Sequence, residues 1–165
     1  MGGLAAPDRA RARLMRPGAS RILITLAGHQ VDEETIRVAC RMASKGRSDG
    51  GKEISRIYAI HVVEVNRSLP LSAPVESQIE RGEQILDAAE RIAAEYDLGI
   101  ETEMVQARDT GPAIVGEADE WHADVIVMGL PYKRRFGEFN LGKTAPYVLK
   151  NAACRVILFR ERLDA

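Results

Sequence analysis

The chain has 165 residues and a formal net charge of -1, with 45% hydrophobic and 28% charged residues. These values are typical of a single soluble globular domain, and they argue against binding to nucleic acid or to an anionic membrane through bulk charge. No apolar run approaches the roughly 20 residues that a membrane-spanning helix needs. The two cysteines, Cys40 and Cys154, form no metal or redox motif, which indicates a reducing cytoplasmic environment.

The ends of the chain differ in composition from its centre. The first twenty residues contain four arginines and two prolines without a helical apolar stripe, and they lack the apolar segment of a signal peptide. We expect residues 1–19 to be a flexible tail or an interdomain linker. The folded α/β domain is expected at 20–161, followed by a C-terminal tail at 162–165.

Apolar, β-branched runs alternate with segments of helical periodicity between these ends. Strands are predicted at 21–27, 54–65, 99–107, 123–129 and 154–160. Helices are predicted at 32–44, from about Ser72 to Tyr96, at 110–122 and at 144–151. Asp32 is a plausible N-cap for the first of these helices. The alternating pattern at 99–107 indicates a strand near an edge, whereas the fully apolar 123–129 indicates a central one.

This alternation predicts an α/β fold with a single open, parallel, five-stranded sheet and helices on both faces, because crossover helices must pack on the sheet. In open sheets of this kind, ligands bind at the carboxyl ends of the strands where the winding direction reverses. The stretch MGLPYKRRFGEFNLGKT, at 128–144, follows the fourth predicted strand and therefore lies at such a place.

Gly137–Thr144, GEFNLGKT, matches the phosphate-loop pattern G-x-x-x-x-G-K-[ST]. A true phosphate loop directly follows a strand, but here the strand ends near Gly129, eight residues before Gly137. The only later strand, at 154–160, has no acidic residue to hold magnesium. An ATPase or kinase acting through Gly137–Thr144 is therefore the least favoured of the functional hypotheses.

The segments ADVIVMG and LGKTAPYVLKNAACRVILFR, together with RILITLAGH, resemble the universal stress protein family over residues 20–161. The resemblance implies a strand order 3-2-1-4-5, homodimers and, in one branch, ATP bound without a catalytic apparatus. The phrases HVVEVNRSLPL and YVLKNAACRV are similar to a subgroup found as cytoplasmic domains of amino-acid and cation transporters. The resemblance thus also implies a transporter or regulatory protein as a partner.

The family motif G-x2-G-x9-G-[ST] is only partly retained. Gly129 and Gly142 match its first and third glycines, whereas Tyr132 replaces the second. Lys143 replaces the Ser or Thr, with Thr144 one position late. Tyr132 does not readily adopt the backbone angles of a glycine, and its ring could plug the site, pack elsewhere or stack on a base.

The turn after the first strand has also changed. Ala27 stands where nucleotide-binding members of the family have an Asp that helps to hold adenosine, and His29 replaces the usual Ser, while Gly28 is retained. A buried hydrogen bond left unmade costs about 1–3 kcal/mol, so the loss of this acceptor is expected to weaken a ribose contact. His29 is a candidate ligand contact, whereas His61 and His122 are interpreted as structural.

The sequence and the resemblance together predict an altered site for an adenine nucleotide, such as ATP or AMP, or for another anion. The base is expected near Leu26, Ala27 and Met128. The phosphate is expected at the amides of Gly142, Lys143 and Thr144, where a helix begins. The cations of Lys133, Arg134 and Arg135 either add charge to this site or form a solvated loop face.

The last predicted strand would be an apolar edge, and pairing with its copy across a two-fold axis would cover it. This predicts a homodimer through Arg155, Val156, Ile157, Leu158 and Phe159. The favoured interpretation is a non-catalytic cytoplasmic regulatory domain with an altered nucleotide or anion site, no nucleic-acid partner and no membrane insertion. The alternative is a dimerising scaffold, or a transporter-associated domain, that binds no small molecule.

Overall fold

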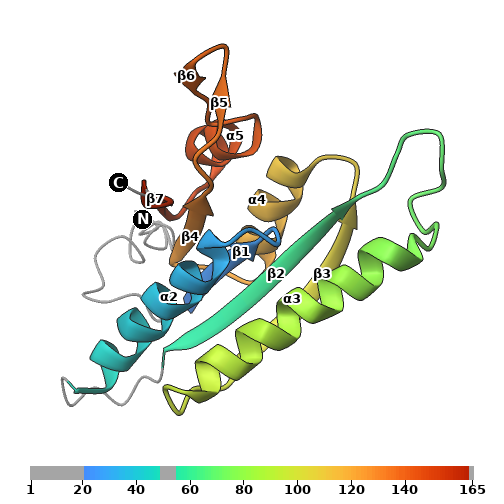
Figure 1. Cartoon of the computed structure of the whole chain (residues 1–165). Helices are drawn as coiled ribbons and strands as arrows, with labels where there is room; N and C mark the ends of the chain where they lie inside the picture. Colours follow the sequence, from blue (N-terminus) through green and yellow to red (C-terminus); the bar gives the residue numbers. More distant parts are fainter. Residues whose placement is uncertain (1–20, 49–54, 164–165) are drawn as a thin grey trace, which may run out of the picture.

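Five parallel strands form the central sheet of the computed structural model, which describes residues 21–48 and 55–163 (Figure 1). The sheet order is β3-β2-β1-β4-β7. The strands are β1 (Arg21–Leu26), β2 (Arg56–Glu64), β3 (Ile100–Ala107), β4 (Val125–Leu130) and β7 (Arg155–Arg160). Because β7 is the fifth strand of this sheet, the predicted α/β fold and its order 3-2-1-4-5 are confirmed.

Two helices cover each face of the sheet. Helices α2 (Val31–Ser48) and α3 (Glu76–Ala94) lie on one face, and α4 (Thr110–Glu120) and α5 (Thr144–Asn151) lie on the other. The period of two along each strand sends successive side chains to opposite faces. In β1, Ile22 and Ile24 pack under α2 and α3, whereas Leu23 packs under α4 and α5.

A short hairpin between β4 and α5 was not predicted. It consists of β5 (Arg134–Arg135) and β6 (Glu138–Phe139), which pair in antiparallel fashion outside the main sheet. Its two turn residues have positive φ, 54° for Phe136 and 81° for Gly137, as expected of a two-residue hairpin turn that matches the twist of the strands. Figure 1 shows the hairpin projecting beyond α5, away from the body of the sheet.

In the part of the chain that the structure describes, no helix is long and apolar enough to cross a membrane. The expected tail at 1–19 lies outside the described residues.

Candidate functional site

A pocket of about 560 Å³ opens at the carboxyl ends of β1, β2 and β4. The sheet order reverses between β1 and β4, because the chain adds β2 and β3 on one side of β1 and adds β4 and β7 on the other. Parallel α/β sheets leave a crevice at such a point, since the flanking connections run to opposite faces. The starts of α4 and α5 and the hairpin supply the walls.

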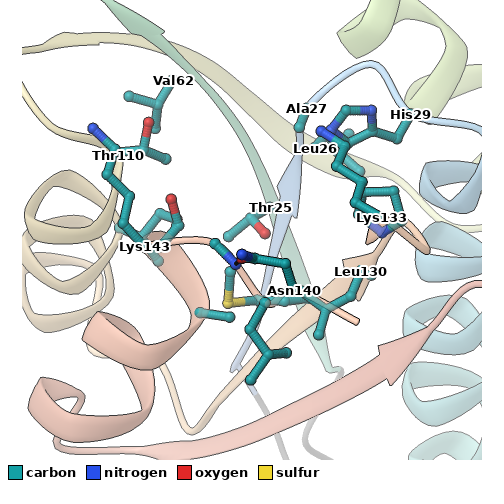
Figure 2. Close-up of a pocket in the computed structure, with 18 of the residues that line it drawn as sticks. Thr25, Leu26, Ala27, His29, Val62, Thr110, Leu130, Lys133, Asn140 and Lys143 are labelled. Atoms are coloured by element: carbon teal, nitrogen blue, oxygen red, sulfur yellow. Dashed lines mark hydrogen bonds between the residues drawn. The ribbon is translucent and has the colours of Figure 1, made fainter. Parts of the chain in front are cut away.

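The floor of the pocket is apolar and lies on the face covered by α4 and α5. Met128 from β4 and Ile60 from β2 are 5% and 0% exposed, and Ile114 from α4 is 1% exposed. Thr25 and Val62 extend this floor along β1 and β2. Figure 2 shows Thr25 and Asn140 near the middle of the pocket, with Thr110 and Lys143 at one end and His29 and Lys133 at the other. An apolar floor with a few polar groups at the rim is the usual form of a small-molecule site.

The structure brings seven of the nine sequence-predicted site residues to the lining of this pocket. These are Leu26, Ala27, Met128, Gly129, Gly142, Lys143 and Thr144. Gly28 and Tyr132 do not line it, although both are close along the chain to residues that do.

Tyr132 packs into the hairpin. Its ring stacks on Phe139, with centroids 5.3 Å apart and planes 8° apart, and the guanidinium of Arg160 lies 5.0 Å from its centroid. Its backbone N–H donates to Glu161 Oε2 at 3.0 Å. Tyr132 therefore ties the hairpin to the end of β7, in agreement with packing rather than with a stacking platform inside the crevice.

The turn after β1 is organised by Asp32. Its Oδ2 accepts hydrogen bonds from the backbone N–H groups of Ala27, Gly28 and His29 at 3.0, 2.7 and 3.3 Å. Burial raises the pKa of the Asp32 carboxyl, although the three amide bonds offset part of this increase. Because α2 begins at Val31, the predicted N-cap role of Asp32 is wrong: the carboxylate caps the preceding turn instead of the helix.

This turn explains the position of Gly28, whose φ is 80°. Its carbonyl accepts a hydrogen bond from Arg81 Nη2 at 3.4 Å, and a Cβ here would meet that guanidinium and the Ile85 side chain. Gly28 thus faces α3, on the side of the sheet opposite to α4 and α5, while its neighbours Ala27 and His29 line the pocket.

Lys143 reaches across one end of the pocket to two carboxylates. Its Nζ lies 3.5 Å from Glu64 Oε1 and 3.6 Å from Asp109 Oδ1. Glu64 Oε1 also accepts from the hydroxyl and the N–H of Thr110, at 2.8 and 3.0 Å. Burial raises the pKa of Glu64, but the Thr110 hydrogen bonds and the Lys143 ammonium together lower it by more than burial raises it. The pKa of this carboxyl is therefore below its ordinary value.

The start of α5 has fewer free amides than the sequence predicted. The N–H of Gly142 donates to Asn140 Oδ1 at 2.6 Å, so this predicted phosphate contact is already occupied. The amides of the first turn of α5 have no partner within the helix because of its geometry, and Thr144 and Ala145 from this turn line the pocket.

Gly137–Thr144 does not form a phosphate loop. The short strand β5 does end just before the Phe136–Gly137 turn, but β6 follows this turn, where a phosphate loop would lead into a helix. Gly137 lies at the tip of the hairpin and does not line the pocket, whereas Lys143 lies at the start of α5. The match is therefore a coincidence of letters across two different structural elements.

Sequence reasoning did not find several residues of this site. Thr25, Ile60, Val62, Thr110 and Asn140 line the pocket, and Glu64 and Asp109 hold Lys143. His61, interpreted as structural, also lines the pocket while its Nδ1 lies 2.8 Å from the carbonyl oxygen of Leu26. Thr25, Glu64, Asp109 and Thr110 share one signal, a position near the carboxyl end of a predicted strand or at the start of a predicted helix. Ile60, within a strand, and Asn140, after the hairpin, do not carry it. Within residues 21–48 and 55–163, no group of three or more His, Cys, Asp or Glu side chains is arranged to hold a metal ion.

Comparison with known proteins agrees with the fold. A profile of the universal stress protein family matches residues 19–160. The chain belongs to this family. It is 29% identical over 147 residues to a universal stress protein of Methanocaldococcus jannaschii, with 86% of this chain and 82% of the relative covered.

Two solved structures of family members share the architecture. The universal stress protein of Archaeoglobus fulgidus in complex with dAMP is similar with a TM-score of 0.61 and 22% identity, covering 84% of this chain and 95% of the other. A universal stress protein family protein of Arabidopsis thaliana with AMP bound has a TM-score of 0.56 and 16% identity, covering 88% and 93%. At these identities the likeness concerns the fold alone.

Proposed function

We propose that this chain is a non-catalytic regulatory protein that holds an adenine nucleotide in the pocket at the carboxyl ends of β1, β2 and β4. The observation that carries the proposal is the pocket itself, which combines an apolar floor, the start of α5 and a cationic rim at the point where the sheet order reverses. Two structurally similar family members are solved with dAMP and AMP, which supports an adenine nucleotide as the ligand class.

The base would lie on the apolar floor against Met128 and Ile60, with the turn at Ala27 beside it. The phosphate would meet the start of α5, where the first amides and the helix dipole favour an anion. Lys133 and Arg134, which line the pocket from the hairpin, would add positive charge. Ligand binding would thus hold the hairpin in one position, and a cytoplasmic partner protein would recognise this position.

A pocket-filling substitution tests the placement. Val62→Phe adds volume to the floor, so we expect AMP to stop raising the melting temperature, whereas wild type with AMP at a hundred times its Kd gains about 2.7 kcal/mol of stability. Val105→Phe is the matched control, because Val105 pairs with Val62 in register on β3 but does not line the pocket. If neither AMP nor ATP shifts the melting of the wild type, the nucleotide proposal is wrong and the scaffold without a ligand is favoured.

We also propose a homodimer through β7. This strand lies at an edge of the sheet, where it pairs with β4 on one side, and Ile157 is 38% exposed. An apolar edge strand invites pairing with another chain, and a two-fold axis lets the same surface pair with itself. Ile157→Lys is expected to shift the sedimentation of the protein from dimer to monomer; a monomeric wild type would contradict the proposal.

A further inference from the structure

The charge of Lys143 is already balanced in the folded chain. Its ammonium bridges Glu64 and Asp109, and Asp109 in turn pairs with Arg67 at 3.1 Å. Two cations and two carboxylates therefore form a cluster with no net charge at the end of the pocket between β2, α4 and α5. The cluster borders the pocket at this end, since Lys143 and Thr110 are both part of the lining.

The remaining positive charge of the lining is on the hairpin, where Lys133 lies at the end opposite to Lys143 (Figure 2). Lys133 and Arg134 line the pocket, and among the described residues neither forms a salt bridge. Arg134 is held by Tyr132, with its Nε donating to the phenol oxygen at 3.2 Å. Two cations match the charge of about -1.5 to -2 that one phosphate monoester carries near pH 7.

The start of α5 offers only a few free backbone amides to a ligand. The amide of Gly142 is occupied by Asn140 Oδ1, and Pro146 has no N–H to offer. The amides of Thr144 and Ala145 therefore remain as donors there for the oxygens of a phosphate group.

We infer that the pocket selects an adenine nucleotide with one phosphate group over nucleotides with two or three, and that Glu64 and Asp109 set this preference. The inference rests on the proposed function. A second and third phosphate that extended toward Glu64 and Asp109 would have to displace Lys143 from these two carboxylates. The phosphates would then lie near two negative charges that Lys143 no longer neutralises, and like charges at this range in a partly exposed site repel.

The test compares AMP and ATP binding by calorimetry, at low ionic strength and without divalent cations. The wild type is expected to bind AMP about fivefold to tenfold more tightly than ATP. In Glu64→Gln/Asp109→Asn the shapes stay and both negative charges are lost, so this ratio is expected to fall to about twofold or less. The control is Asp119→Asn/Glu120→Gln, which removes the same two charge types at the opposite end of α4 and should keep the wild-type ratio.

A second measurement does not depend on the folding of the double variant. Raising the salt concentration screens exposed charges, so the ratio in the wild type should narrow as salt is added. Binding of ATP as tight as that of AMP by the wild type, or an unchanged ratio in the folded double variant, overturns the inference and leaves the proposed function standing. Failure of both nucleotides to bind the wild type overturns the proposed function itself.

Discussion

The two ends of the sheet differ in how the face under α4 and α5 is filled. At the amino ends of the strands, the rings of Tyr58 and Trp121 lie 5.1 Å apart, and the Arg21 guanidinium lies 4.7 Å from the Trp121 ring. At the carboxyl ends, the same face carries smaller side chains, such as Thr25 and Val62, and a pocket of about 560 Å³ remains. Large rings close one end, and their absence leaves the other open.

The polar groups at the two ends differ in the same way. At the closed end, the Tyr58 hydroxyl lies between two carboxylates, 2.8 Å from Glu103 Oε2 and 2.9 Å from Glu117 Oε2. At the open end, Lys133 and Arg134 line the pocket from an exposed hairpin. Substitutions at the closed end should therefore change stability more than binding, and substitutions at the open end should change binding.

The largest effect is expected from Trp121→Ala. Removing a large, partly buried ring costs its transfer free energy and leaves a cavity, so we expect the free energy of unfolding to fall by about 3 kcal/mol. Urea denaturation followed by far-UV circular dichroism would measure this, because Trp121 is the only tryptophan and its fluorescence is lost. Trp121→Phe should cost far less, since the Trp121 Nε1 is buried without a hydrogen-bond partner among the described residues. Loss of AMP binding by folded Trp121→Ala would contradict the independence of the two ends.

A smaller loss is expected from Asp32→Ala, at the open end. The substitution leaves the amides of Ala27, Gly28 and His29 without their shared acceptor, and we expect a loss of about 2 kcal/mol. The AMP affinity should fall too, because Ala27 and His29 line the pocket.

Asp32→Asn is the matched variant, since it keeps an acceptor oxygen at nearly the same place. It should recover part of both losses in urea denaturation and in AMP titration. An Asp32→Ala protein that is less stable but binds AMP as the wild type does would show that the turn supports the fold alone.

The sheet could be predicted from the sequence because each strand and helix carries its own periodicity. The apolar run at 123–129 and the helix start at Thr144 predict that Met128, Gly129 and Lys143 lie near one another. All three line the same pocket. The pattern of alternating strands and helices then fixes where the carboxyl ends meet.

The hairpin and the partners of Lys143 could not be predicted in the same way. Strands of two residues are too short to show alternation, and the turn Phe136–Gly137 lacks the Asn-Gly or Asp-Gly signal of such hairpins. Glu64 and Asp109 lie on β2 and before α4, far from Lys143 in the sequence, so only the folded sheet brings them together. The preference of Asp for N-cap positions depends on local sequence alone. It does not show whether the Asp32 carboxylate will accept from the amides that follow it in the helix or from those that precede it in the turn.

The smallest effect is expected from Tyr58→Phe, at the closed end. Near pH 8 the loss of the hydroxyl leaves Glu103 and Glu117 without this donor, and we expect a cost of about 1 kcal/mol. Burial and the two carboxylates raise the pKa of Tyr58, so the unfolded chain ionises first, at about pH 10. The folded wild type therefore keeps its stability below that pH and loses it as the pH rises further, by up to about 1.4 kcal/mol per pH unit from this group.

Tyr58→Phe has no phenol at this position and so does not lose stability in this way at high pH. The difference in the free energy of unfolding between the wild type and Tyr58→Phe should therefore close as the pH approaches 11. Urea denaturation of both at pH 8, 9.5 and 11 measures the gap directly. Tyr147→Phe, on the exposed side of α5, is the control for the removal of a tyrosine hydroxyl elsewhere in the chain. A Tyr58 gap that stays constant up to pH 11 would mean that the hydroxyl is not held between the carboxylates, and that the closed end is filled by ring packing alone.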